Sequence, residues 1–444
     1  MKHCRTSFYK VAFFFLGVLF IASPLFAQDL SYDRYTETLR EPEAPSRVGR
    51  SIAHFLVYPF EIIRYGTDKT LVAIEKHHID KKVKWIYEKI QSYGISPHLN
   101  FVSMSNRSYG ADIDFIRLVQ KKEYLPDSTL SGWVRWAEDG YFRAGGKVGW
   151  SLIKGTGLRT FGIANYENRH EEHFYGVGPH SSAGDGAVFS WEETKLEYQL
   201  GYSKTPEWGI DGKFSYRNVN ISGGRDGGRG QIGEIPTFSE ERIPGFHGDS
   251  FLTWKLEVIH DTRNQKENST IGGMQRFGFS FNEGLNSSLA RFFRYETEVS
   301  HYFRLGADRR VLAFHFYGEH NDEVNNGQVP FHQMAKLGGY GTSPHMSHTL
   351  RGYDFNRFFD ESALLFNIEY RYTIWEYRDY KLDTVFFWDE GQVFGEFSEF
   401  QLSDFRESYG IGFRLSVANV MFLALEVAHG DEGTNLYVKG SSPF

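Results

Sequence analysis

The residues with the chemistry for an active site gather in one short polar stretch. Ser343, His345, Ser347 and His348 lie close together in sequence, but a Ser-His catalytic pair depends on geometry that adjacency does not supply. GTSPH, which begins at residue 341, is not the G-x-S-x-G of a nucleophile elbow, and that pentapeptide occurs nowhere in the chain. His77 and His78 are adjacent, so on a helix they point in different directions and make a poor metal pair. We therefore expect no catalytic residues, no metal site and no cofactor.

A more specific arrangement surrounds the arginine of LRGYDFNRFF, residues 350–359. Arg351 is followed by Gly352 and Tyr353. Alone, an Arg-Gly pair is typical of a turn with a solvated charge. A guanidinium can also bind a carboxylate through two parallel hydrogen bonds, and such pairs are stronger and more directional than neutral ones. The significance of Arg351 therefore depends on which acidic side chains the neighbouring elements bring to it.

Those elements alternate with period two from about residue 98 to the end. In Leu364–Ile374, apolar side chains fall on one face, whereas Glu369 and Arg371 fall on the other. Residues 196–202, 409–416 and 421–427 repeat this division. A soluble β-sandwich would not carry Glu and Arg on its inward face. A barrel in a bilayer has the inverse arrangement, with apolar side chains outward and polar ones in the lumen. Alternation thus directs Glu369 into the lumen.

The composition supports a membrane β-barrel. The chain has 40 Phe, 26 Tyr and 9 Trp among 444 residues, as expected for strands with one apolar face and aromatic girdles at both interfaces. No run of 18 apolar residues follows residue 28, which excludes an ordinary transmembrane helix from that part. We predict an all-β antiparallel barrel of about 16 strands over residues 98–444. The net charge of -7 does not indicate a nucleic-acid partner.

The first 97 residues predict two further segments. Residues 1–27 combine basic residues with the apolar run 11–22, which indicates a secretory signal peptide. The only cysteine, Cys4, precedes that run and would be removed with it. Residues 28–97 are predicted to be a periplasmic extension, with apolar residues at helical spacing between about 50 and 93. This lysine-rich amphipathic helix could pack on its own protein or lie on a membrane surface.

An ordered set of motifs resembles the barrel of the BamA/TamA superfamily, also called the bacterial surface antigen barrels. Gly338 and Gly339 are followed by the Arg-Gly-aromatic triplet at 351–353. Asn-x-Glu-aromatic-Arg then follows at 367–371, and aromatic-Asp-x-Gly at 388–391. Several matches in order over about sixty residues are a strong signal, whereas any one alone would be weak. Because residues 28–97 show no strand pattern, the chain looks like the branch without POTRA domains.

The resemblance implies a location, a site and a function. It implies a bacterial outer membrane of the Gram-negative type, with Arg351 on a loop inside the lumen, held by Asp389 and Glu369 beside Gly391. We expect membrane lipids as partners, and client outer-membrane proteins or periplasmic factors recruited through residues 68–93. The implied function is to aid protein insertion or local membrane remodelling. The alternative is a passive or gated pore for small solutes or lipids.

Overall fold

The structure is a computed structural model that describes most of the chain from residue 140 onward. It describes residues 89, 95–98, 110–116 and 129–137, and residues 140–444 except 154, 225–229, 236–237, 267, 287–289, 307–308, 341–347, 378–379, 418–419 and 440–443. All of these fall in the compact unit Lys82–Phe444, and none in the unit Met1–Lys81. The predicted signal peptide lies outside the described residues, as does the predicted helix at 68–93 apart from Lys89.

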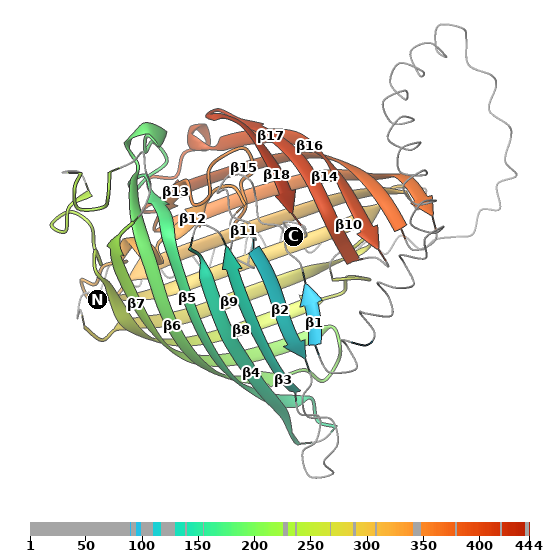
Figure 1. Ribbon diagram of the computed structural model, residues 1–444, viewed down its shortest axis with the longest axis horizontal. Coiled ribbons are helices and arrows are strands. Elements are labelled where there is room, and N and C mark those ends of the chain that lie inside the picture. The colour runs from blue at the N-terminus through green and yellow to red at the C-terminus, as the bar shows by residue number, and fades with distance from the viewer. Residues whose placement is uncertain are drawn as a thin grey trace, which may run out of the picture. The chain divides into compact units, whose positions relative to one another are not determined.

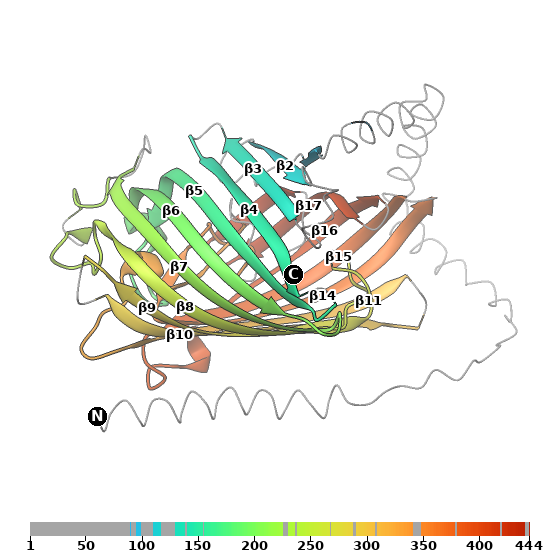
Figure 2. The same ribbon diagram turned by 90° about the horizontal axis from the view of Figure 1, so that it is seen from below.

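Sixteen antiparallel strands form one curved sheet, which confirms the predicted fold class and strand number (Figures 1 and 2). The strands are β1 (Ile95–His98), β2 (Gly110–Ile116), β3 (Thr129–Ala137), β4 (Phe142–Ile153), β5 (Leu158–Phe174), β6 (Ala187–Tyr202), β7 (Trp208–Gly223), β8 (Gly248–Asp261), β9 (Gly272–Gly284), β10 (Arg291–Arg304), β11 (Arg310–Glu323), β14 (Ser362–Tyr377), β15 (Tyr380–Phe394), β16 (Arg406–Val417), β17 (Val420–Gly430) and β18 (Gly433–Lys439). Among the described residues, β1 and β18 are the two edges of this sheet.

Every strand pairs with its neighbour along the chain except where β12 (Ala335–Leu337) and β13 (Phe358–Asp360) intervene between β11 and β14. These two short strands pair with each other inside the long β11–β14 connection. We call the described residues between 324 and 361 the lumen loop. Three 3-10 turns complete the secondary structure described: η2 (Ala183–Asp185), η4 (Phe331–Gln333) and η5 (Leu402–Asp404). No helix among the described residues has the length and apolar character needed to cross a membrane.

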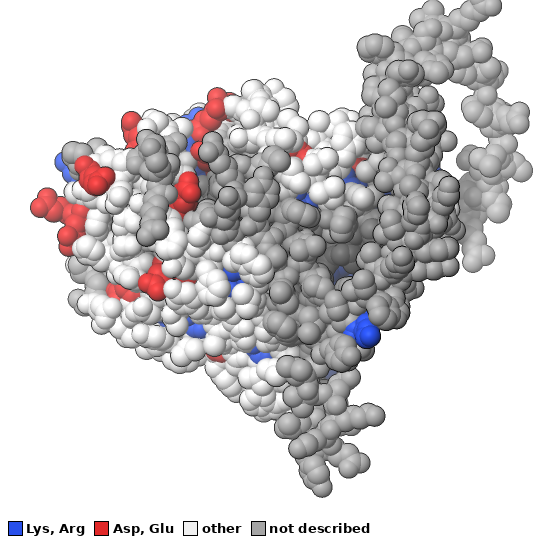
Figure 3. Space-filling model, viewed as in Figure 1, with Lys and Arg blue, Asp and Glu red and all other residues white. Residues whose placement is uncertain are grey.

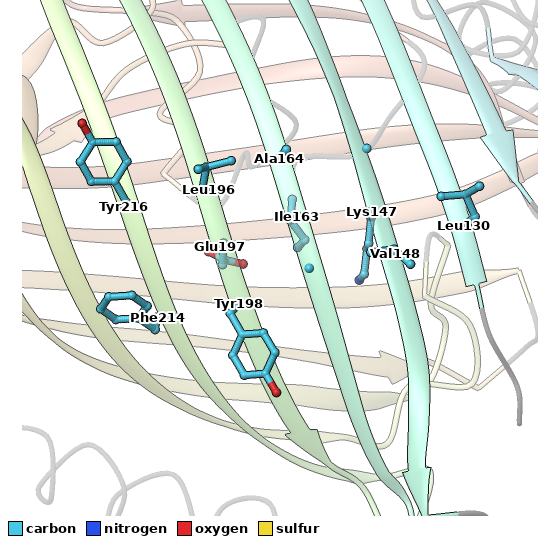
Figure 4. Close-up of a pocket in the computed structure, with 12 residues that line it drawn as sticks. Leu130, Lys147, Val148, Ile163, Ala164, Leu196, Glu197, Tyr198, Phe214 and Tyr216 are labelled. Carbon is cyan, nitrogen blue, oxygen red and sulfur yellow. The ribbon is translucent and has the colours of Figure 1, made fainter. Parts of the chain in front are cut away.

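The two faces of the sheet differ as the alternation predicts. On β6, Leu196, Tyr198 and Leu200 point outward and are 41–53% exposed, while Glu197 lies on the opposite face. The outer surface in view is mostly uncharged, and most of the acidic side chains in view lie toward one end (Figure 3). That outer face includes an apolar groove of about 620 Å³ across β3–β7, whose lining includes Leu196, Tyr198 and Phe214 (Figure 4). An uncharged outer wall and a polar inner wall fit insertion in a bilayer.

The two ends of the barrel also differ. Connections at one end, such as β4–β5 and β6–β7, are short turns, whereas those at the other end, such as β5–β6, β7–β8 and β11–β14, are long. At the long-loop end an apolar core lies under the connections. We call it the cap core; it comprises Phe174, Ala187, Phe189, Val219, Ile221, Ile232, Phe238, Ile243, Phe251, Ala290, Phe292, Val329, Phe331, Met334 and Phe359. Four of its members, Val329, Phe331, Met334 and Phe359, belong to the lumen loop, so that loop contributes to closing this end.

Candidate functional site

The lumen loop places Arg351 against the inner wall of the barrel. The side chain is 0% exposed. Its Nε and Nη2 donate to the two carboxylate oxygens of Asp389 at 2.6 and 2.5 Å, and its Nη1 donates to Glu369 Oε1 at 2.7 Å. The backbone N–H of Arg351 also donates to Asp389, at 3.2 Å. This geometry is the bidentate pairing that the guanidinium fork favours, with both carboxylates that the sequence had indicated.

The guanidinium also lies flat on an aromatic ring of the wall. Its Cζ is 3.6 Å from the ring centroid of Phe387, which is on β15 two residues before Asp389. A cation over the face of an aromatic ring is attracted by the ring quadrupole, and more strongly where water is excluded. Arg351 therefore has partners for both its charge and its flat face, as a fully buried cation requires.

The site extends further along the wall than the motif predicted. Arg414 on β16 donates to Glu369 at 2.7 and 2.9 Å and to Glu426 on β17 at 2.7 and 2.9 Å. Arg371 donates to Glu369 at 2.8 Å. Lys439 on β18 lies 3.1 Å from Glu426, and the Tyr340 hydroxyl donates to the same carboxylate at 3.0 Å. We call this connected group, Tyr340, Arg351, Glu369, Arg371, Asp389, Arg414, Glu426 and Lys439, the brace.

The brace joins the loop to five strands through ion pairs between buried charges. Four cationic side chains meet three carboxylates, and all of them are 5% exposed or less. Such a network is costly to bury and costlier still to break, because removing one partner leaves the others charged in a dry site. The brace therefore fixes the lumen loop against the barrel wall. Among the described residues, no group of three or more His, Cys, Asp or Glu is arranged to bind a metal ion.

The other predicted residues lie where the loop approaches the wall most closely. Gly352 has φ of +89°, and its N–H donates to the Tyr437 hydroxyl at 3.0 Å. A Cβ at Gly352 would lie 3.0 Å from the backbone N of Gly430, so a side chain would strain the turn. Tyr353 is 1% exposed and its hydroxyl donates to the Glu407 carbonyl at 3.0 Å. At Gly391 a Cβ would come within 3.0 Å of Leu337 from β12, so glycine leaves room for the loop.

Sequence reasoning missed Arg414, Glu426 and Lys439 as members of the site. The signal for the first two was present, since both alternate with apolar residues in strands recognised from their period. What the sequence did not show was the neighbour relation between β14, β15, β16 and β17 that brings their side chains together. Three of the four candidate hydrolase residues, Ser343, His345 and Ser347, lie outside the described residues. The ring of the fourth, His348, lies 6.3 Å from that of Tyr317.

Comparison with known proteins gives the family of this barrel. The model of the Omp85 superfamily domain matches residues 141–428, well over half of the chain. The chain belongs to the Omp85 superfamily. This match extends from just before β4 to near the end of β17 and includes the whole lumen loop and most of the brace. No curated protein matches the chain.

Solved structures show the same fold at low sequence identity. BamA from Haemophilus ducreyi lacking POTRA domains 1–3 matches with a TM-score of 0.56 and 15% identity, covering 78% of this Omp85 chain and 68% of that one. CdiB from Escherichia coli matches with a TM-score of 0.52 and 9% identity, covering 78% of this chain and 62% of that one. The chain thus spans about two thirds of the length of these solved chains, and at this identity the likeness establishes the fold.

Proposed function

We propose that this Omp85 barrel lies in the bacterial outer membrane and aids the insertion of client proteins or remodels the membrane locally. The observation that supports this proposal best is the combination of a lumen loop fixed by the brace with two sheet edges, β1 and β18, that share no ladder pairing among the described residues. A passive, permanently open conduit would be obstructed by a loop fixed in its lumen. Unpaired strand edges, in contrast, offer backbone donors and acceptors to an incoming strand.

In this proposal the brace keeps the β14–β18 wall rigid while the β1–β18 edges exchange partners with a client strand. Membrane lipids contact the apolar outer wall, and client proteins approach the edges through the bilayer. The recruiting role that we predict for residues 68–93 stays a prediction, which crosslinking from those positions in cells can address.

No step requires bond chemistry, so we propose that the protein is not an enzyme; phospholipase activity lost on Ser343→Ala would contradict this.

The test is a reconstitution with an unfolded barrel protein as client. Proteoliposomes containing the wild-type chain should raise the rate at which the client becomes heat-modifiable and protease-resistant, by severalfold over empty liposomes of the same lipids. Liposomes carrying an equal amount of an unrelated closed barrel are the control for membrane disturbance. If this chain accelerates client folding no more than that control barrel does, the insertion proposal is wrong.

The alternative, a gated pore, is favoured by a separate set of lumen charges. Lys213 on β7 lies 2.6 Å from Glu257 on β8, and Lys255 lies 2.5 Å from Glu296 on β10. These ion pairs, in which the lysine side chains are 20–21% exposed, line the wall away from the brace, as in a water-filled channel. Planar-bilayer recordings separate the two functions: steady, large channels from the wild-type protein would favour the pore, whereas a closed barrel predicts rare or small openings.

A further inference from the structure

The lumen loop contacts the wall at a second place, near its beginning and away from the brace. Gln333, the last residue of η4, is 3% exposed. Its side-chain oxygen accepts a hydrogen bond of 2.7 Å from Arg217 Nη2 on β7, and its backbone oxygen accepts one from Arg294 Nη2 on β10. We call Gln333, Arg217 and Arg294 the neck clamp. One residue of the loop is thus held by two guanidinium groups from strands that take no part in the brace.

Both arginines of the neck clamp are oriented by the wall itself. Arg294 Nε donates to Asn321 Oδ1 at 2.8 Å and lies 3.2 Å from Glu319, both on β11. Arg217 lies over the ring of Phe251 at 5.7 Å and 3.9 Å from Glu193. Each guanidinium therefore has an anionic partner on the wall and donates to Gln333 through its Nη2. The clamp is a prepared site for a neutral acceptor, whereas the brace is built from opposite charges.

Apolar packing reinforces the clamp. Phe331, two residues before Gln333, is 0% exposed, and its ring lies 4.9 Å from that of Phe174 and 5.2 Å from that of Phe189. The Lys336 ammonium donates to the His332 carbonyl at 3.1 Å and lies over the rings of Trp191 and Phe359. This part of the loop is therefore packed against β5–β8 within the cap core, on a different arc of the barrel from the brace.

The β12–β13 ribbon lies between the first part of the loop and its tip. Ala335, Lys336 and Leu337 pair with Asp360, Phe359 and Phe358, which closes the loop upon itself between its two wall contacts. Arg351 lies between β12 and β13 in the sequence, in the segment that the pairing of these two strands closes. The ribbon also packs against Leu350 and Tyr353 of the tip. The hydrogen bonds of the ribbon and of the neck clamp involve no brace residue, so we expect residues 331–337 to stay in place when the brace is broken.

We propose that the lumen loop is a strap with two independent attachments, and that the neck clamp keeps the lumen closed when the brace is released. The brace and the clamp bind separate arcs of the wall, β14–β18 and β7–β10, so the strap ties the two parts of the barrel across the lumen. Release of the tip frees the wall strands β14–β18 without opening a channel. This inference concerns closure of the lumen and does not rest on the insertion activity.

Hydrogen–deuterium exchange of the folded, full-length protein in nanodiscs tests the independence of the two attachments. In Arg351→Ala we expect faster exchange in residues 349–357 and unchanged protection in residues 331–337. In Gln333→Met, which keeps the side-chain length and the backbone acceptor of Arg294 but removes the side-chain acceptor of Arg217, we expect the reverse. Loss of protection in 331–337 on Arg351→Ala, to the same extent as in 349–357, would show one cooperative unit and overturn the proposal.

Planar-bilayer conductance tests the closure. We expect Arg351→Ala and Gln333→Met each to leave the channel mostly closed, and the double variant to show large openings at least about ten times as often as either one. Frequent large openings in Arg351→Ala alone would contradict the proposal. Because Gln333→Met could alter folding, Gln333→Glu is the matched variant: its carboxylate still accepts from Arg217, so it should close the lumen as the wild type does. In the Arg351→Ala background Gln333→Glu should therefore stay mostly closed, and an Arg351→Ala/Gln333→Glu barrel that opens as often as Arg351→Ala/Gln333→Met would also overturn the proposal.

Discussion

At the scale of single residues, Arg351 shows how a buried charge is tolerated. It has two carboxylates, one ring face and no exposure. Arg351→Ala would leave Asp389 and Glu369 without this partner, which typically costs about 3–5 kcal/mol. We expect the folded barrel to lose its resistance to heat in SDS gels at a markedly lower temperature, and Asp389→Asn to do the same without additivity.

The control for this prediction is Arg291→Ala. Arg291 pairs with Glu283, but the two side chains are 36% and 31% exposed, so the loss is about 0–1 kcal/mol. Equal melting temperatures for Arg351→Ala and Arg291→Ala would refute a stabilising brace. Arg351→Lys is informative as well: an ammonium keeps the charge but not the fork, so we expect an intermediate melting temperature.

Gly352 allows a second prediction at this scale. Gly352→Ala combines a positive φ with a Cβ placed 3.0 Å from Gly430 N and from Ser408 Cβ. Gly306 has φ of +70° but no atom within 4 Å of the added Cβ, so Gly306→Ala carries only the conformational strain, about 1 kcal/mol. The urea concentration at the unfolding midpoint should fall more for Gly352→Ala. A larger fall for Gly306→Ala would show that close approach to β16 and β17 is unimportant.

At the scale of elements, the corner between β13 and β14 links stability to pH. Burial raises the pKa of Asp360 to about 6, with Glu399 adding repulsion. Burial also raises the pKa of Glu361 to about 7, with Glu323, Asp360, Glu396 and Asp322 contributing. The folded corner therefore holds protons that the unfolded chain releases. Its stability is fully present below the usual carboxyl pKa values and is lost as pH rises from about 4 toward 7.

Limited proteolysis of the corner, compared between about pH 5 and pH 8 with a protease active at both, should give faster cleavage near residues 358–362 at the higher pH. Glu361→Gln removes the carboxyl whose pKa is raised to about 7, and it should reduce the difference in cleavage rate between the two pH values. Cleavage that slows as pH rises, after correction for protease activity, would mean that these carboxyls are ionised in the folded corner.

The elements also show what a sequence can predict. Period-two alternation identified the strands at 196–202, 364–374, 409–416 and 421–427 and the lumen side of Glu369. The ordered motifs identified Arg351 as a site residue, because the Arg-Gly pair is followed along the chain by the acidic residues Glu369 and Asp389. Gln333 and Arg217 carry no such signal, since they are 116 residues apart. Their contact depends on where a loop packs, which local patterns do not encode.

At the scale of the whole molecule, the two faces of the wall should respond oppositely to charge. Leu196 points outward and is 53% exposed, whereas Gln199 alternates with it and faces the lumen. Leu196→Arg places a charge in hydrocarbon and should cost up to about 2–4 kcal/mol, and Gln199→Arg should cost little. Folding into liposomes, followed by heat-modifiability, measures both. Equal tolerance of arginine at the two positions would contradict a bilayer around this wall.

The β5–β6 connection makes hydrogen bonds to residues far along the chain, and this affects the order in which the protein folds. The Tyr175 hydroxyl donates to Asp354, 179 residues later, and Arg357 donates to Ser181, 176 residues earlier. Contacts this distant in sequence form only after a large loss of chain entropy. The β5–β6 connection therefore waits for residues 354–357 before it acquires these partners. These contacts of the β5–β6 connection therefore form late in folding, once the chain as far as Arg357 is in place.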